Sequence, residues 1–170
     1  MKQQSRKMAV CGMTAALGVV IMLLGAVLGL GMYLSPMLVG LCLIPIGKEW
    51  GVKYHLMLWA VIGLLSLILV SNVEQNLMFI GLFGWYPALR PKLQNLPRTL
   101  RLCVKLLIFN VIVISLEVLI MTVLVPETMG TVFTVVLLVM GNITFVLYDF
   151  AIPRFEIITR KYLKKIFPKR

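Results

Sequence analysis

The sequence predicts an all-α membrane protein, a compact bundle of six transmembrane helices with both chain ends in the cytoplasm. The first observation is composition: 61% of the 170 residues are hydrophobic, 14% are charged, and the mean hydropathy is +1.00. Soluble domains average about 45–50% apolar and about 25% charged residues. This composition excludes a soluble enzyme, a disordered chain and a disulfide scaffold. The second observation is that the 17 lysines and arginines are confined to a few clusters.

Three long segments contain no lysine or arginine, namely 8–47, 54–89 and 106–153. One membrane-spanning helix needs roughly 20 apolar residues, so each segment is long enough for two passes. Clusters of Gly, Pro, Asn and Ser interrupt helices. Such signals lie near the middle of each segment, at 29–36, 71–76 and 126–130. We therefore expect three helical hairpins within a single transmembrane domain that covers residues 1–170.

The six helices are expected at about 8–29, 33–47, 53–71, 76–90, 100–125 and 129–152. The first follows a basic N-terminus but is too long for the apolar part of a signal peptide, so it is expected to be retained. The second and fourth are short for a membrane span, which leaves four spans with two re-entrant segments as the alternative. Basic and apolar residues interleave over 154–170, which predicts an interfacial amphipathic helix that extends the sixth.

The distribution of charge predicts the orientation of the bundle. Cytoplasmic loops of membrane proteins are enriched in Lys and Arg, so the ends and loops that carry all 17 bases are expected in the cytoplasm. The opposite turns carry only Glu74 and Glu127. We interpret the net charge of +11 as a topology signal that favours contact with anionic lipids, and not as a nucleic-acid-binding surface.

A few polar residues are expected at membrane depth, where they are costly and often functional. Glu117 falls in the outer half of the fifth helix, away from any base, so we expect it to be protonated, to line a water-filled cavity or to meet a ligand. Asn110 and Asn142 fall at the same depth of adjacent antiparallel helices, either as an interhelical hydrogen bond or as part of a ligand site. Asp149 is expected to pair with a base near the cytoplasmic boundary. The bases within reach are Arg101, Lys105 and Arg154.

The sequence has no arrangement that favours catalysis or metal binding. Cys11, Cys42 and Cys103 are expected as small apolar residues at the reducing cytoplasmic side, without disulfides. His55 is the only histidine and has no second ligand at metal-binding spacing, so an interfacial position is expected. A P-loop pattern is also missing, so ATP energy would have to come from a partner. We expect no enzymatic activity of the chain and no cofactor.

The first helix carries small residues on two roughly opposite sides, at 100° per residue. One stripe consists of Ala9, Gly12 and Ala16, and the other of Gly18, Gly25 and Gly29. Small residues let helix backbones approach closely in lipid. We expect one stripe to face the bundle and the other to remain for a partner.

A six-helix protein with cytoplasmic ends, very short loops and a small-residue stripe on its first helix resembles the S components of energy-coupling factor transporters. These are membrane-embedded subunits that capture the substrate. In that family an Ala-x-x-x-Ala-like stripe docks a shared transmembrane T component, which is coupled to two ATPases. Here the nearest match is Gly12-x-x-x-Ala16, with Ala9 one turn earlier. The segments 84–89 (Gly-Trp-Tyr-Pro-Ala-Leu) and 141–150 (Gly-Asn-Ile-Thr-Phe-Val-Leu-Tyr-Asp-Phe) resemble a group of small S-component-like bacterial membrane proteins.

This resemblance implies a multi-pass protein of a bacterial cell membrane that binds a small molecule such as a vitamin and is energised by partner ATPases. The substrate would bind in the outer half, beneath the turns opposite the basic side. The residues expected to line this site are Asn72, Glu74, Gln75, Asn76, Glu117 and Asn142. The T component would contact Ala9, Gly12 and Ala16.

Two other classes of function remain open. A scaffold or assembly protein of the cell envelope, similar in size to the rod-shape-determining membrane family, would bind no ligand and would tolerate substitution of Glu117. A membrane enzyme or self-contained channel would be active as the purified chain alone. Copurification with T and ATPase components distinguishes the transport subunit from both.

Overall fold

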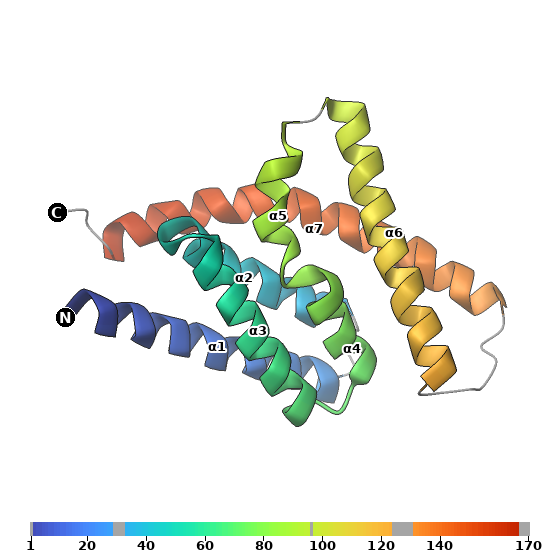
Figure 1. The fold of residues 1–170 in the computed structure, drawn as a ribbon, viewed down its shortest axis with the longest axis horizontal. Helices are drawn as coiled ribbons and strands as arrows, with labels where there is room; N and C mark the ends of the chain where they lie inside the picture. The colour runs from blue at the N-terminus through green and yellow to red at the C-terminus, as the bar shows by residue number, and fades with distance from the viewer. Residues whose placement is uncertain (1, 29–32, 96, 124–130, 167–170) are drawn as a thin grey trace.

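The computed structural model describes residues 2–28, 33–95, 97–123 and 131–166, and every regular element in these ranges is helical (Figure 1). The elements are α1 (Lys2–Leu28), α2 (Leu34–Trp50), α3 (Val52–Leu69), α4 (Val73–Met78), the π-helix η1 (Phe79–Phe83), α5 (Tyr86–Leu93), α6 (Arg98–Val123) and α7 (Thr131–Ile166). The expected all-helical class is therefore confirmed. The turn at 126–130 with Glu127, and Gly29 of the first helix, lie outside the described residues.

The helices assemble around two apolar cores that share α2 and η1. α1, α2 and α3 contact one another, and their core includes the buried side chains of Met22, Leu43 and Ile62. The second core joins α2, η1, α5, α6 and α7 and includes Phe109 and Tyr148. α7 runs beside α2 and contacts α6, and its last turns lie at the same end of the molecule as the start of α1 (Figure 1).

Four helices in the described ranges are long and apolar enough to cross a membrane. They are Gln4–Leu28, Val52–Leu69, Thr99–Ile120 and Leu138–Thr159. Many large apolar side chains on these helices are exposed, with Ile68 81%, Leu107 63% and Phe150 67% accessible. Soluble monomers rarely expose so much contiguous apolar surface. The chain is thus an all-helical protein compatible with a membrane-embedded position.

The remaining expected spans differ from the four in the structure. α2 has 17 residues and contains Pro45, and the expected fourth helix is divided into α4, η1 and α5. α1 starts at Lys2, earlier than expected, so the basic N-terminal residues belong to the helix. The sixth helix and the basic segment after it form one helix, α7, which passes through Pro153 without ending.

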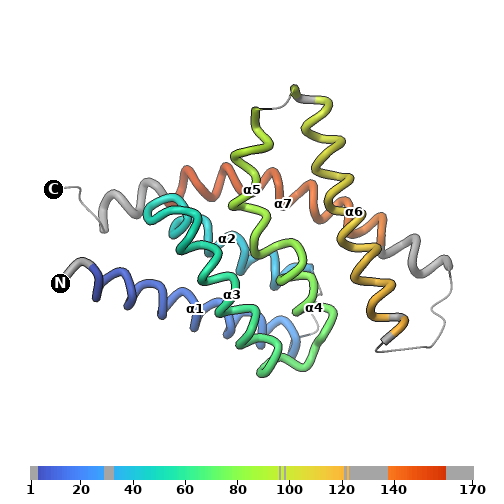
Figure 2. Tube along the Cα trace, viewed as in Figure 1, coloured from blue at the N-terminus to red at the C-terminus, as the bar shows by residue number. Residues whose placement is uncertain are grey.

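The division of the fourth segment lies at Gly84 and Pro87, where the helical hydrogen bonds are interrupted. Pro87 has no N–H, so the Phe83 carbonyl loses the donor that a continuous α-helix would supply. The Gly84 amide donates five residues back to Phe79, at 2.9 Å, and so forms the π turn. In a continuous α-helix the Ala88 amide would donate to the Gly84 carbonyl, but here it donates to the Trp85 carbonyl at 3.0 Å. The carbonyls of Phe83 and Gly84 therefore accept no hydrogen bond from the amide four residues later. The trace bends between α4 and α5 (Figure 2).

Two buried side chains from other helices supply the missing donors. The Tyr148 hydroxyl of α7 donates to the Phe83 carbonyl at 2.9 Å, and Nε2 of His55 on α3 lies 2.8 Å from the Gly84 carbonyl. Both side chains are at most 1% exposed. A backbone break in an apolar interior is tolerated only where other groups satisfy its polar atoms. Side chains of α3 and α7 thus stabilise the break by contacting its two free carbonyls.

Candidate functional site

Polar residues on α4 link the turn between α3 and α4 to the rest of the bundle. The Asn72 side chain caps α4 by accepting a hydrogen bond from the Gln75 amide at 3.1 Å. Nε2 of Gln75 donates to the Met22 carbonyl of α1 at 2.7 Å. Nδ2 of Asn76 donates to carbonyls near the end of α3, those of Ser66 at 3.1 Å and Val70 at 3.0 Å. Three of the expected substrate-binding residues therefore also have a structural role.

The same two carboxamides each keep one oxygen without a hydrogen bond. Gln75 Oε1 and Asn76 Oδ1 are buried and have no partner among the described residues, and the two side chains are 0% and 1% exposed. An unmatched buried acceptor costs about 1–3 kcal/mol. These oxygens are suited to accept hydrogen bonds from a ligand that carries N–H or O–H groups.

Two carboxylates gather near Tyr33 at this end of the bundle. Tyr33 is the residue that precedes α2. The carboxylates of Glu74 on α4 and Glu117 on α6 both interact with the Tyr33 hydroxyl through Coulomb forces. Both glutamates are half-buried. The Tyr33 hydroxyl also lies 3.6 Å from the position that a Cβ on Gly141 of α7 would occupy. Groups from four parts of the chain thus lie near one another at this end of the bundle.

Asn142 is engaged with Asn110 and not with this group. Nδ2 of each asparagine donates to the side-chain oxygen of the other at 3.0 Å, so the two amides form a reciprocal pair between α6 and α7. Each Nδ2 also donates, at 2.8 Å, to a carbonyl of its own helix, Leu106 or Leu138. The interhelical interpretation of this pair is therefore the one that the contacts support.

The opposite half of the bundle contains an ion cluster around Asp149 of α7. Oδ1 accepts hydrogen bonds from the Tyr86 hydroxyl at 2.8 Å and from Arg90 Nε at 2.9 Å. Nζ of Lys105 lies 2.6 Å from Oδ2 and 2.8 Å from Oδ1. Lys105 was among the expected partners, whereas Tyr86 and Arg90 of α5 were not, because their approach depends on the division of the fourth segment. The cluster fastens α5, α6 and α7 together.

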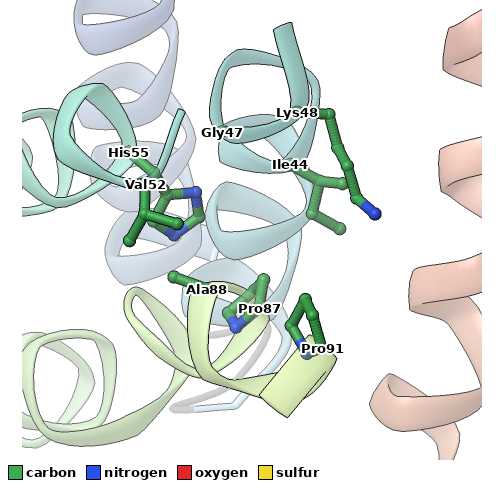
Figure 3. A pocket seen from close by; sticks show the side chains of 8 residues that line it. All are labelled: Ile44, Gly47, Lys48, Val52, His55, Pro87, Ala88 and Pro91. Atoms are coloured by element: carbon green, nitrogen blue, oxygen red, sulfur yellow. The ribbon is translucent and has the colours of Figure 1, made fainter. Parts of the chain in front are cut away.

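His55, expected at the membrane interface, is buried at the bend of the divided segment. The ring is 1% exposed, and besides its contact with Gly84 its Nδ1 lies 3.2 Å from the Leu43 carbonyl of α2. A cavity of about 140 Å³ is lined by residues that include His55 and Lys48 (Figure 3). Its lining comes from α2, α3 and α5 and consists of Ile44, Gly47, Lys48, Val52, His55, Pro87, Ala88 and Pro91.

The two small-residue stripes of α1 have opposite environments. Gly18 faces the bundle, where an added Cβ would lie 2.9 Å from Ile62 Cδ1, and Gly25 faces Ser35 and Gln75. Ala9, Gly12 and Ala16 are all exposed, and a Cβ on Gly12 would meet nothing within 4 Å. One stripe therefore packs internally and the other is open, the division that the sequence predicts.

Comparisons of the chain with protein-family models, curated proteins and solved structures find no match. Within the described ranges, no group of three or more His, Cys, Asp or Glu side chains is placed to hold a metal ion. The two segments 84–89 and 141–150, which carry the local sequence resemblance, contact each other: the Tyr86 ring lies 5.0 Å from that of Phe145, and its hydroxyl bonds Asp149. The resemblance thus falls on one structural unit, the divided segment and the part of α7 beside it.

Proposed function

We propose that the chain is a membrane-embedded substrate-capture subunit of an energy-coupling factor type importer, with no enzymatic activity of its own. The observation that carries this proposal is the open stripe of Ala9, Gly12 and Ala16 on α1. A self-contained bundle has no need of a second small-residue face, whereas a subunit that docks a partner helix in lipid does. The energy for uptake would come from ATPase subunits, reached through a transmembrane T component that contacts this stripe.

In this proposal α2 and the divided segment 73–93 complete a six-helix bundle with both ends in the cytoplasm of a bacterial cell. The lysines and arginines then contact anionic lipids of the inner leaflet. Discontinuous helices are frequent at the binding sites of membrane transporters, because an interrupted backbone and its neighbours expose polar groups at depth. The helix is divided at Gly84, and α4, which precedes the division, carries buried polar side chains. Both features support a transport role over a ligand-free envelope scaffold.

The proposed ligand is a small molecule bound at the outer end, among Glu74, Glu117 and the free oxygens of Gln75 and Asn76. Asn72 would shape this site by capping α4, and Asn142 by joining α6 to α7. The polar groups at this end include carboxylates and amide oxygens, which favours a ligand that donates hydrogen bonds. Purification from native membranes in mild detergent, with mass spectrometry of the bound proteins and small molecules, tests the proposal. A T component, ATPase subunits and a bound small molecule are expected.

Glu117→Gln is expected to lower the amount of copurifying small molecule at least about tenfold, since a carboxylate that accepts a ligand's hydrogen bond contributes about 1.5–3 kcal/mol. The partner proteins should still copurify, because α1 is unchanged. Glu49→Gln makes the same chemical change at an exposed carboxyl at the end of α2 and should have no effect. Equal ligand content in the wild type and Glu117→Gln, in protein of equal thermal stability, would favour the ligand-free scaffold.

A further inference from the structure

The single histidine of the chain lies on α3, between α2 and the break of the divided segment. Both ring nitrogens are within hydrogen-bond distance of backbone carbonyls, Nδ1 at 3.2 Å from Leu43 and Nε2 at 2.8 Å from Gly84. A carbonyl oxygen only accepts hydrogen bonds. The ring therefore faces two acceptors and, at 1% exposure, has little contact with solvent.

The number of protons on the ring decides how many of these contacts are hydrogen bonds. A neutral imidazole has one N–H and one nitrogen lone pair, whereas an imidazolium has two N–H groups. With two facing carbonyls, only the imidazolium can donate to both. In the neutral ring, the nitrogen without a proton and the carbonyl opposite it would each present a lone pair, and that contact would be repulsive.

A cavity lies next to this ring. The cavity of about 140 Å³ is lined by His55 itself and by Lys48, near the end of the molecule that carries the basic residues (Figure 3). A space of this volume exceeds what one water molecule requires. We therefore take this cavity as the place where the ring would exchange a proton with water.

Two of the cations on the helices around the ring, Lys48 and Arg90, are paired with carboxylates of α7. The charged or titratable side chains on the helices around the ring include Lys48 on α2, Lys53 and Tyr54 on α3, and Tyr86 and Arg90 on α5. Lys48 Nζ lies 2.9 Å from Glu156, and both Tyr86 and Arg90 bond Asp149. Burial is the largest influence on the protonation of His55 and favours the neutral ring, whereas hydrogen bonds from the ring to the two carbonyls favour the protonated ring.

We propose that His55 is a proton-binding site that latches the break at Gly84 to α2. In the protonated state Nδ1–H donates to Leu43 and Nε2–H donates to Gly84, so α2, α3 and the start of α5 are held together. On deprotonation Nε2 keeps its proton, since its contact is the shorter, and the proton on Nδ1 passes to water in the cavity. The hydrogen bond to the Leu43 carbonyl is lost. Because this bond connects α2, through His55, to the start of α5, α5 can then move relative to α2. This latch goes beyond the proposed import function and does not depend on the ligand or the partner.

Nitrogen NMR of protein labelled at histidine tests the proposal directly, because the chain has only one histidine and both ring-nitrogen signals therefore belong to His55. Couplings of each nitrogen to the carbon-bound ring hydrogens distinguish Nδ1 from Nε2. The full chain in lipid nanodiscs is titrated between about pH 5 and pH 8, the range in which histidine ordinarily changes charge. We expect two protonated ring nitrogens at low pH and loss of the Nδ1 proton alone as the pH rises. A ring that keeps the same number of protons throughout, or that loses the Nε2 proton first, would overturn the proposal.

Hydrogen exchange of the α5 amides measures the mechanical consequence. After correction for intrinsic exchange, protection of 84–93 in the wild type should fall about tenfold across the titration, the size expected for one buried hydrogen bond. His55→Gln should remove this pH dependence. Tyr148→Phe, which removes only the bond to Phe83, should lower protection equally at every pH. A pH dependence in His55→Gln equal to that of the wild type would contradict the latch.

Discussion

Asp149→Asn is expected to lower the unfolding free energy of the bundle by about 3–5 kcal/mol, the range for a buried ion pair that loses one partner. Asp149 is the carboxylate that neutralises both Lys105, which is 6% exposed, and Arg90. In the variant, two cations remain in an apolar interior without a counter-charge, and one amide oxygen replaces the two carboxylate oxygens that accept from Tyr86, Arg90 and Lys105. Thermal and denaturant unfolding in mild detergent measures the loss.

A matched substitution separates this effect from a general effect of removing a carboxylate. Glu156→Gln on the same helix breaks the pair with Lys48, whose side chain is 43% exposed. Exposed pairs contribute about 0–1 kcal/mol, so a small change is expected. Replacing Lys105 by Met together with Asp149→Asn should recover part of the loss, because one uncompensated buried charge is removed. Equal destabilisation by Asp149→Asn and Glu156→Gln would contradict this account of the cluster.

Gly40→Ala is expected to cost about 2–4 kcal/mol, from overpacking and from the loss of a buried hydrogen bond. A Cβ at Gly40 would overlap both the Phe83 carbonyl and the Tyr148 hydroxyl, the two groups that bond each other at the break. α2 would have to move away from η1, and the Phe83 carbonyl would lose its donor. The same unfolding measurements apply.

Gly12→Ala is the control for Gly40→Ala, because both replace a helical glycine by alanine. Gly12 has open space around its Cβ position, so the substitution should be neutral or stabilising by up to about 1 kcal/mol through helix propensity. If Gly40→Ala were tolerated as well as Gly12→Ala, the close approach of α2 to the break would not be a requirement of the fold.

The helical class and the two sides of α1 could be predicted because their causes are local. Hydropathy over about 20 residues determines whether a segment can span a membrane. The 100° rotation per residue separates Gly18 from Gly12 in any regular helix, and the structure has Gly18 against Ile62 and Gly12 in the open. Neither prediction requires knowledge of which other segment comes near.

The break at Gly84 could not be predicted from local signals. Proline and glycine occur in many membrane helices without dividing them. Here the division depends on donors that lie far away in the chain, His55 at a separation of 29 residues and Tyr148 at 65. The partners Tyr86 and Arg90 of Asp149 were missed for the same reason, because the course of α5 after the break determines where they point.

For the polar residues expected to bind a ligand, the sequence indicates how deep each residue lies in the bundle but not where its side chain points. The sequence places Gln75 and Asn76 at a turn, but their amide groups face the Met22 carbonyl and the end of α3. Asn142 likewise faces Asn110. Such amides donate to backbone carbonyls that lack a hydrogen bond within their own helix. The tertiary packing determines which of these carbonyls lie near each amide. Glu74 and Glu117 lie near Tyr33, and their role in binding a ligand stays a prediction.

Photo-crosslinking from α1 in native membranes tests the central claim, that the chain is a subunit with a docking face for a membrane partner. A photoreactive amino acid is placed at position 12 or, as control, at Leu24, which is 53% exposed and about 120° away around the same helix. We predict that position 12 gives a defined adduct with a transmembrane protein that is coupled to ATPase subunits, and that position 24 does not. Adducts with lipid alone from position 12, or identical adducts from both positions, would contradict the claim.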